Sequence, residues 1–398
     1  MDKEAQKTME LLTNGTAETF PADSLAETVE SAYERKKPLS IKIGIDPTTP
    51  NVHIGHMVPF LRIRKLQDLG HRCRLVIGDM TARIGDPTGE SAERPRLSAE
   101  DTAENSSTYS MQIFRILDPE KTEVHRQSTW YGRWGIAEII EWSSKLGLGW
   151  MLSHETYRSR LESGKRLGLH ELLYPLFQAY DSVFLKPDIE FGGTDQRFNI
   201  LCGRELMKSA GLDPQAVVLL PLLPGTDGEK MSKSKGNDIR LNDTPADIFG
   251  KVMSIPDSRM EAYARLLLTG NREGESVLHN MKDDPMKAKK TLAFGVTRLF
   301  CSEETAGEAE EHFNRTVVKK EPPGEIPRVL YVPGTAITDI LVDSGCSSSK
   351  SEARRLISGG GVSIDLKKIL DPGYIVGEKD SGSVIKAGKR RYLRLEIE

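Results

Sequence analysis

The sequence predicts an α/β protein in which a parallel-sheet domain is followed by an α-helical domain and then by a small α+β domain. From Leu39 onward, strand-like and helix-like segments alternate, which is typical of a parallel sheet with helices on both faces. Beyond Ile239 the strand patterns stop and helical patterns follow one another, until a proline-containing linker at 321–324. We therefore expect a Rossmann-like domain at 1–238, a helical domain at 239–325 and a compact domain at 331–398.

The expected elements follow from the spacing of apolar residues along the chain. Residues up to about Ser31 have the pattern of one or two amphipathic helices. Strands are expected at 40–46, 72–78, 121–126, 188–191 and 217–223, with helices among them at 55–69, 102–117 and 196–210. Helices at 245–253, 258–268, 286–301 and 304–314 would form the helical domain. The last domain would contain helices at 336–344 and 350–358 and strands at 362–364, 383–385 and 392–397.

The composition describes an ordinary soluble protein. Of the 398 residues, 38% are hydrophobic and 28% charged, and the formal net charge is −3. This charge argues against wholesale polyanion binding, so a nucleic acid would have to be recognised through a local patch. The four cysteines have no spacing typical of zinc sites or disulfide frameworks. We see no apolar run of membrane-spanning length and no export signal, so we expect a cytoplasmic enzyme without a structural metal.

The first chemically informative segment is His53-Ile54-Gly55-His56, between the strand at 40–46 and the helix at 55–69. A helix N-terminus offers unpaired N–H groups and positive potential, which suit a phosphate. The two imidazoles add donors, and the glycine lets a ligand approach the backbone closely. Taken alone, the segment is equally compatible with ordinary surface histidines.

A second segment, Lys230-Met231-Ser232-Lys233-Ser234, lies on a loop flanked by glycines. Cations on such a loop suit a polyphosphate that must be clasped and then released. The alternative is a solvated run of charge, but the interleaved serines and flanking glycines favour phosphate contact.

Three polar residues, Tyr174, Gln178 and Asp181, are spaced at i, i+4 and i+7, which places them on one face of a helix. Two helical turns span roughly ten ångströms, enough to line a pocket for one amino acid. A solvent-facing polar stripe is the alternative. Asp86 lies in a tight turn after a strand-like segment, where turn chemistry is the competing explanation. Gln196 ends a segment that leaves a strand and opens a helix, and the alternative there is that Thr194 or Asp195 serves only as the helix N-cap.

In their order and spacing, five segments resemble the bacterial tyrosyl-tRNA synthetase family of class I aminoacyl-tRNA synthetases. They are 44–56, 84–89, 174–181, 191–200 and 230–234, and they include counterparts of the HIGH and KMSKS motifs of class I. Residues 331–398 resemble the S4-type RNA-binding domain at the end of that family, especially at 349–357. The resemblance covers the chain beyond its first thirty residues.

The resemblance implies a reaction and its partners. L-tyrosine would be activated with ATP, accompanied by Mg²⁺, to tyrosyl-adenylate and pyrophosphate. Tyrosine would then be transferred to the 3′ end of tRNA(Tyr). The family also implies a homodimer.

The resemblance also assigns roles to residues of this chain. ATP would contact Asp46, Thr48, His53, Gly55, His56, Lys230 and Lys233, of which the two histidines and two lysines would be catalytic. Asp86, Tyr174 and Gln178 would hold the tyrosine ammonium group, Asp181 the phenolic hydroxyl, and Gln196 the carboxylate. Lys350, Arg354 and Arg355 would contact RNA.

One position departs from the family pattern. Many members have a tyrosine eleven residues before the first motif histidine, where it helps to read the substrate hydroxyl, but this chain has Lys42. A second bacterial subgroup has a similar lysine. The departure therefore weakens the assignment of one contact to the substrate hydroxyl more than it weakens the assignment of the family.

Three other functions share part of this pattern. A tryptophanyl-tRNA synthetase would have the same fold, but neither a hydroxyl-reading Asp181 nor an S4-like tail. A nucleotidylyltransferase would have the histidine motif but no reason for an RNA-binding tail. A catalytically inactive RNA-binding relative would not need both phosphate motifs intact.

Overall fold

The computed structural model describes residues 2–21, 24–87, 97–232, 235–319, 326–388 and 391–398. The chain forms two compact units, Met1–Ala306 and Gly307–Glu398. The linker expected at 321–324 lies outside the described residues, and the finer division of the first unit into two domains stays a prediction. Among the described residues, no helix is long and apolar enough to cross a membrane.

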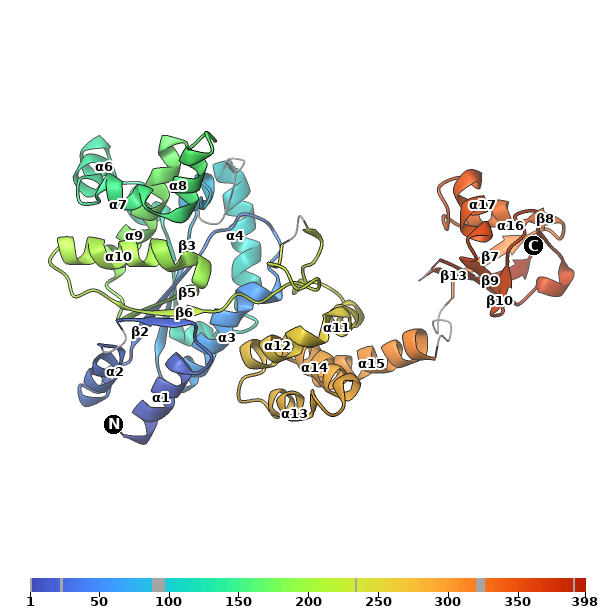
Figure 1. Ribbon diagram of the computed structural model, residues 1–398, viewed down its shortest axis with the longest axis horizontal. Coiled ribbons are helices and arrows are strands. Elements are labelled where there is room, and N and C mark those ends of the chain that lie inside the picture. The colour runs from blue at the N-terminus through green and yellow to red at the C-terminus, as the bar shows by residue number, and fades with distance from the viewer. Residues whose placement is uncertain (1, 22–23, 88–96, 233–234, 320–325, 389–390) are drawn as a thin grey trace. The chain divides into compact units, whose positions relative to one another are not determined.

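The first unit contains a six-stranded sheet (Figure 1). Its strand order is β1 (Glu18–Phe20), β6 (Ala216–Leu220), β5 (Ile189–Gly193), β2 (Ser40–Ile45), β3 (Arg72–Ile77) and β4 (Thr122–Arg126). The strands from β6 to β4 are parallel to one another, at the positions that the sequence predicts. By contrast, β1 is antiparallel to β6 and lies where only helices were expected. The sheet is therefore mixed.

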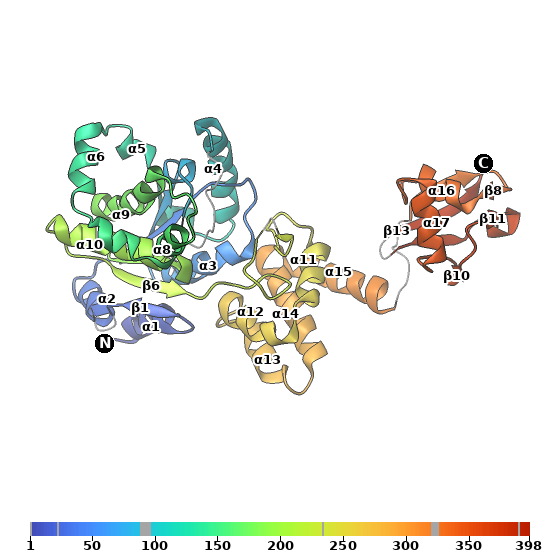
Figure 2. The ribbon, with the colours of Figure 1, turned by 45° about the horizontal axis from the view of Figure 1, so that its top comes forward.

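Helices cover this sheet because its central strands are apolar on both faces. All five residues of β6 are buried, which is typical of a strand enclosed between two layers. The main covering helices are α3 (Ile54–Asp68), α4 (Ala99–Ile113), α9 (Leu173–Leu185) and α10 (Arg197–Ser209), with α1 (Lys3–Thr13) and α2 (Ser24–Glu34) near β1. Four short helices gather beside α9 and α10 (Figure 2): α5 (Ser128–Tyr131), α6 (Ile136–Ser143), α7 (Leu148–Leu152) and α8 (Glu155–Glu162).

Beyond the sheet the chain is helical, as predicted. The helices are α11 (Pro245–Ser254), α12 (Met260–Leu267), α13 (Arg272–Asn280), α14 (Pro285–Phe300) and α15 (Glu303–Phe313). Of these, α13 was not predicted, although its Val277 is fully buried.

The second unit is a small α+β domain built on a five-stranded sheet of order β10-β9-β12-β13-β7. The strands are β7 (Arg328–Tyr331), β9 (Val362–Ile364), β10 (Lys367–Ile369), β12 (Val384–Ala387) and β13 (Arg391–Ile397). A separate pair is formed by β8 (Thr335–Ala336) and β11 (Ile375–Val376). The helices α16 (Ile337–Asp343) and α17 (Lys350–Ser358) share a hydrophobic core with these strands. The two helices and three of the strands coincide with the sequence prediction.

The strand order of the first unit predicts where a ligand binds. From β2 the chain continues to β3 and β4 on one side, whereas β5 and β6 lie on the other side. The order therefore reverses between β2 and β5. In open α/β sheets, ligands bind at such a reversal, outside the carboxyl ends of the strands.

Candidate active site

Asp46 lies directly after β2, at the carboxyl edge of the sheet. Its Oδ1 accepts a hydrogen bond from Thr81 Oγ1 (2.7 Å), and its Oδ2 accepts one from the Tyr174 hydroxyl (2.9 Å). A Cβ at position 78 would lie 2.0 Å from Asp46 Oδ1, so this close approach requires Gly78. The backbone N–H of Thr48 donates to the Asp46 carbonyl oxygen (2.8 Å). A residue predicted to contact ATP and one predicted to contact tyrosine are thus in direct contact.

The two motif histidines lie at the start of α3, where His53 is the N-cap residue. The rings of His53 and His56 stack, with centroids 3.7 Å apart and an interplanar angle of 24°. Burial lowers the pKa of His53 to about 3 and that of His56 to about 4. Both imidazoles are therefore neutral at pH 7, and each can donate one N–H to a phosphate oxygen.

The histidine motif and the lysine loop meet, although they are far apart in the sequence. A Cβ at Gly55 would lie 3.6 Å from the Met231 sulfur. The backbone N–H of Ile54 donates to the Ile239 carbonyl oxygen (2.9 Å), which fixes the end of the loop beside the start of α3. The structure thereby joins the two segments that the sequence singled out.

Lys230 points to the loop that follows β5. Its Nζ lies 3.3 Å from Asp195 Oδ2, and both side chains are partly exposed. Asp195 also lines a cavity of about 460 Å³ together with Trp150, His154 and Phe198. The other predicted loop cation, Lys233, lies outside the described residues, so its role stays a prediction.

Helix α9 carries Tyr174, Gln178 and Asp181, as the spacing predicts. Tyr174 and Asp181 are buried and Gln178 is partly buried. Near them, Gln196 Nε2 donates to Asp86 Oδ2 (2.7 Å), so these two predicted tyrosine contacts are also neighbours. The candidate tyrosine site is therefore assembled from α9 and from the loops after β3 and β5.

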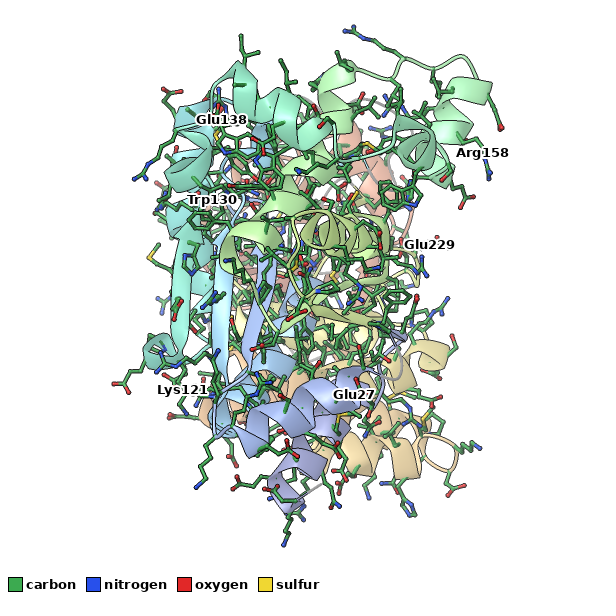
Figure 3. The ribbon with its side chains drawn as sticks, turned by 90° about the vertical axis from the view of Figure 1, so that its left-hand side faces the viewer. Glu27, Lys121, Trp130, Glu138, Arg158 and Glu229 are labelled. Carbon is green, nitrogen blue, oxygen red and sulfur yellow. The ribbon has the colours of Figure 1, made fainter. Side chains whose placement is uncertain are left out.

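Asp181 is held by three donors and is only 2% exposed. Gln127 Nε2 lies 2.7 Å from Oδ2, while Trp130 Nε1 and the Tyr131 hydroxyl each lie 3.2 Å from Oδ1 (Trp130 is labelled in Figure 3). The Tyr131 hydroxyl also lies 2.5 Å from the Phe177 carbonyl oxygen, so its single hydrogen is shared between the two acceptors. Burial raises the pKa of Asp181 to about 7, against the opposing effects of the Lys42 ammonium group and of the hydrogen bonds from Gln127 and Tyr131. The group therefore titrates near neutral pH.

The sequence analysis did not identify these three donors. Gln127 also links the two halves of the site, because its Oε1 accepts a hydrogen bond from the Thr81 backbone N–H (3.0 Å) and lies 2.9 Å from Thr81 Oγ1. One signal was available, since Gln127 directly follows β4 and so lies at the same sheet edge as Asp46. No comparable signal pointed to Trp130 and Tyr131.

Lys42, for which the sequence analysis expected a departure from the family pattern, is 1% exposed. Its Nζ donates to Ser182 Oγ (2.8 Å) and to the Gln178 carbonyl oxygen (3.2 Å), and it pairs with Glu190 Oε1 (2.8 Å). The lysine is thus enclosed between β5 and α9.

The three predicted RNA contacts lie on α17 of the second unit. Arg354 and Arg355 are exposed. Lys350 is exposed as well, but its Nζ pairs with Asp339 Oδ1 (2.7 Å). Among the described residues neither arginine forms an ion pair as close as that of Lys350, although Arg355 is near enough to Glu352 to lower the pKa of that carboxyl group.

No arrangement of three or more His, Cys, Asp or Glu side chains that could hold a metal ion is found within the described part of the chain.

Comparison with known proteins identifies two families along this chain. Residues 34–318 match the family described as tRNA synthetases class I (W and Y), and residues 337–381 match the S4 domain. The chain is 42% identical over 393 residues to a tyrosine–tRNA ligase of Chlorobium luteolum, covering 98% of this chain and 97% of the relative. It is 45% identical over 367 residues to a tyrosine–tRNA ligase of Thermotoga maritima, covering 91% of each.

Solved structures share the fold at lower identity. A C-terminally truncated mitochondrial tyrosyl-tRNA synthetase of Coccidioides posadasii has a TM-score of 0.63 at 24% identity, covering 78% of this chain and 92% of that one. The tyrosyl-tRNA synthetase of Archaeoglobus fulgidus, solved with L-tyrosine, has a TM-score of 0.63 at 20% identity, covering 77% and 99%. Given the family match, the near full-length relatives and the geometry above, this chain belongs to the class I tRNA synthetases and, among them, to the tyrosine–tRNA ligases.

Proposed function

We propose that this site activates L-tyrosine with ATP to form tyrosyl-adenylate and pyrophosphate, and that the enzyme then transfers tyrosine to the 3′ end of tRNA(Tyr). The contact between Tyr174 and Asp46 carries the assignment of the site. The 2.9 Å hydrogen bond supports it, because it joins a residue proposed to contact tyrosine to a residue proposed to contact ATP. Adenylate formation needs the two substrates held side by side in this way.

The first step needs no protein base, because the tyrosine carboxylate is already ionised at neutral pH. A carboxylate oxygen attacks the α-phosphorus of ATP, and the bond from that phosphorus to the pyrophosphate oxygen breaks. The enzyme has to align the reactants and stabilise the charge that moves onto pyrophosphate. His53 and His56 would donate hydrogen bonds as neutral imidazoles, while Lys230 and Lys233 would supply positive charge. Mg²⁺ would enter bound to the ATP phosphates.

Lys230 would change partners when ATP binds. In the structure Lys230 Nζ lies 3.3 Å from Asp195 Oδ2, with relative side-chain exposures of 52% and 28%. A partly exposed ion pair contributes only about 0–1 kcal/mol, so releasing it costs little. The ammonium group can therefore move to the phosphates at a small energetic cost.

The tyrosine contacts would divide among the polar groups of the site. Asp86, Tyr174 and Gln178 would hold the ammonium group, and Asp181 would accept the phenolic hydrogen bond. Gln196 would reach the substrate carboxylate. Its Nε2 donates to Asp86 but carries a second hydrogen for this contact.

The assignment is tested by ATP–pyrophosphate exchange with each of the twenty amino acids, followed by charging of tRNA(Tyr). We expect exchange with tyrosine alone. Exchange driven by tryptophan would identify the related synthetase instead. Exchange without any amino acid would favour a nucleotidylyltransferase, and no exchange at all would favour an inactive RNA-binding relative.

We also propose that the second unit contacts tRNA through Arg354 and Arg355, and that the enzyme is a cytoplasmic homodimer.

The dimer proposal is supported by apolar side chains exposed in one stretch of the first unit. Ile136 is 76% exposed, Ile140 62% and Leu169 80%. Side chains of this kind are typical of surfaces that another protein covers.

A further inference from the structure

The register of the central strands pairs a lysine with a glutamate beneath α9. Lys42 on β2 is the direct partner of Glu190 on β5, so both side chains leave the same face of the sheet. Their charged atoms are 2.8 Å apart, and the side chains are 1% and 2% exposed. This is a fully buried ion pair in the middle of the sheet, next to the candidate tyrosine site.

The pair is completed by neutral donors. Glu190 Oε2 accepts hydrogen bonds from Ser182 Oγ (3.1 Å) and from Gln215 Nε2 (2.5 Å), while Oε1 faces Lys42. Both carboxylate oxygens are therefore satisfied. Since apolar residues of similar volume often stabilise a core as well as a buried ion pair does, stability alone does not explain this one.

The contacts of Lys42 point to the tyrosine site. Its Nζ donates to the Gln178 carbonyl oxygen (3.2 Å) and to Ser182 Oγ (2.8 Å). These two residues delimit the turn of α9 that carries Asp181. The lysine thus reaches the turn on which the proposed hydroxyl acceptor sits, and it contacts the backbone of a second tyrosine-site residue.

We propose that Lys42 and Glu190 form a positioning pair that determines specificity in the tyrosine site. The ammonium group holds the turn 178–182 in place and supplies the positive charge that keeps Asp181 a hydrogen-bond acceptor for the substrate hydroxyl. Lys42 acts through Asp181 and does not itself have to touch the substrate. This inference rests on the proposed role of Asp181.

The electrostatic surroundings of Asp181 give the pair a distinctive signature. The charged and titratable groups that face it are Lys42 on β2, Glu190 on β5 and Tyr131 on α5, beside the neutral donors Gln127 and Trp130. Lys42 lowers the pKa of Asp181, whereas Glu190 raises it. Removing the charge of Lys42 should therefore raise the pKa of Asp181, and removing the charge of Glu190 should lower it. A pair with a purely structural role would not give these opposite shifts.

The experiment compares Lys42→Met, Glu190→Gln and the double variant in the full-length enzyme. The measurements are kcat/KM for tyrosine and for phenylalanine in ATP–pyrophosphate exchange, at pH values from about 6 to 9. For Lys42→Met we expect the tyrosine-to-phenylalanine ratio to fall about 10- to 100-fold, the effect of a lost hydrogen bond to a charged group. The pH at which tyrosine activation is half-maximal should rise in Lys42→Met and fall in Glu190→Gln.

Two further variants make the test independent of folding. The double variant leaves no unpaired charge, so it should recover thermal stability without recovering the tyrosine-to-phenylalanine ratio. Arg160→Met is the matched control, because Arg160 and Glu171 form another buried ion pair, with exposures of 2% and 3%. We expect this control to lower thermal stability while leaving the ratio and the pH profile unchanged.

Measuring Asp181→Ala in the same assays separates a failure of this inference from a failure of the proposed role of Asp181. If Asp181→Ala changes the ratio and Lys42→Met changes neither the ratio nor the pH profile, the inference about the pair is wrong and the proposed role of Asp181 stands. If Asp181→Ala leaves the ratio unchanged, the proposed role of Asp181 is wrong, and the inference fails with it.

Discussion

At the scale of single residues, the site depends on groups whose protonation is set by burial. Asp181 titrates near neutral pH because its carboxylate is removed from water, and the two motif histidines stay neutral for the same reason. Because of the first effect, Asp181 is fully ionised, and so accepts a hydrogen bond as a carboxylate, only above neutral pH. The second provides phosphate donors that carry no charge of their own.

Asp181→Ala should impair the use of tyrosine far more than the use of phenylalanine. Only tyrosine brings a hydroxyl group to this carboxylate, and a hydrogen bond to a charged group contributes about 1.5–3 kcal/mol. We expect kcat/KM for tyrosine to fall about 10- to 100-fold relative to that for phenylalanine. Equal losses for the two substrates would give Asp181 a structural role only.

The motif histidines should make the folded state less stable in acid. In the unfolded chain they bind protons below about pH 6.5, whereas in the folded chain their pKa values are about 3 and 4. The unfolded state therefore takes up more protons between about pH 6.5 and 4, and stability is lost as the pH falls through this window. His56→Asn should reduce this loss, which denaturant unfolding at pH 7 and pH 5 would measure. An unchanged difference between the two pH values would contradict the assignment.

At the scale of elements, the sequence predicts what lies within one element better than what lies between elements. The face formed by Tyr174, Gln178 and Asp181 follows from helical spacing alone, and α9 confirms it. Strand β1 was missed because three residues carry too little periodicity, and its partner β6 lies far along the chain. The donors Trp130 and Tyr131 were missed for a similar reason. They lie on a single helical turn and meet Asp181 only in the folded protein.

The same distinction applies to the loops. The sequence predicts that His53-Ile54-Gly55-His56 begins a helix, and α3 does begin at Ile54. The contact of Gly55 with Met231 could be expected only from the family resemblance, because no pattern within either segment refers to the other. Pairing between Lys42 and Glu190 likewise depends on strand register, which the order of the strands along the chain does not reveal.

Helix α17 provides a prediction about RNA binding. Arg354→Ala combined with Arg355→Ala should weaken tRNA binding and reduce the slope of log affinity against log salt concentration by about 2, if each arginine contacts one phosphate. Lys350→Ala is the matched comparison. Since Lys350 already pairs with Asp339, its removal should have a smaller effect. Binding titrations at several salt concentrations would measure both, and equal effects of the two changes would contradict the prediction.

At the scale of the whole molecule, the two compact units suggest a division of labour. The proposed activation site lies entirely within the first unit, whereas the S4 domain lies within the second. Because β7 (Arg328–Tyr331) pairs with β13, a truncation that removes the second sheet completely must precede Arg328.

Truncation after Lys319 should leave tyrosine-dependent ATP–pyrophosphate exchange nearly unchanged. The charging of tRNA(Tyr) should fall sharply, because the phosphate contacts of the second unit are lost. Both activities can be measured on one preparation, so the exchange rate serves as the control for folding. A truncated enzyme that charged tRNA at the full rate would contradict the RNA-binding assignment.

The proposed homodimer makes a separate prediction. Leu169→Glu combined with Ile140→Glu would place charges among the exposed apolar side chains of the first unit, where an interface would have to bury them. Sedimentation should then show monomers where the unaltered enzyme shows dimers. Val317→Glu, which changes an apolar side chain that is 54% exposed outside this stretch, serves as the control. A dimer that persisted in the double variant would place the interface elsewhere.

The buried pair of Lys42 and Glu190 also restricts the routes by which this sequence can evolve. Replacing Lys42 by tyrosine would leave Glu190 charged and without its cation in the core. Losing one member of a buried pair costs about 3–5 kcal/mol, a large part of the 5–15 kcal/mol that typically separates folded from unfolded protein. Either single exchange therefore passes through a strongly destabilised intermediate. In this chain, the residues at positions 42 and 190 are therefore constrained to change together, although they lie on different strands.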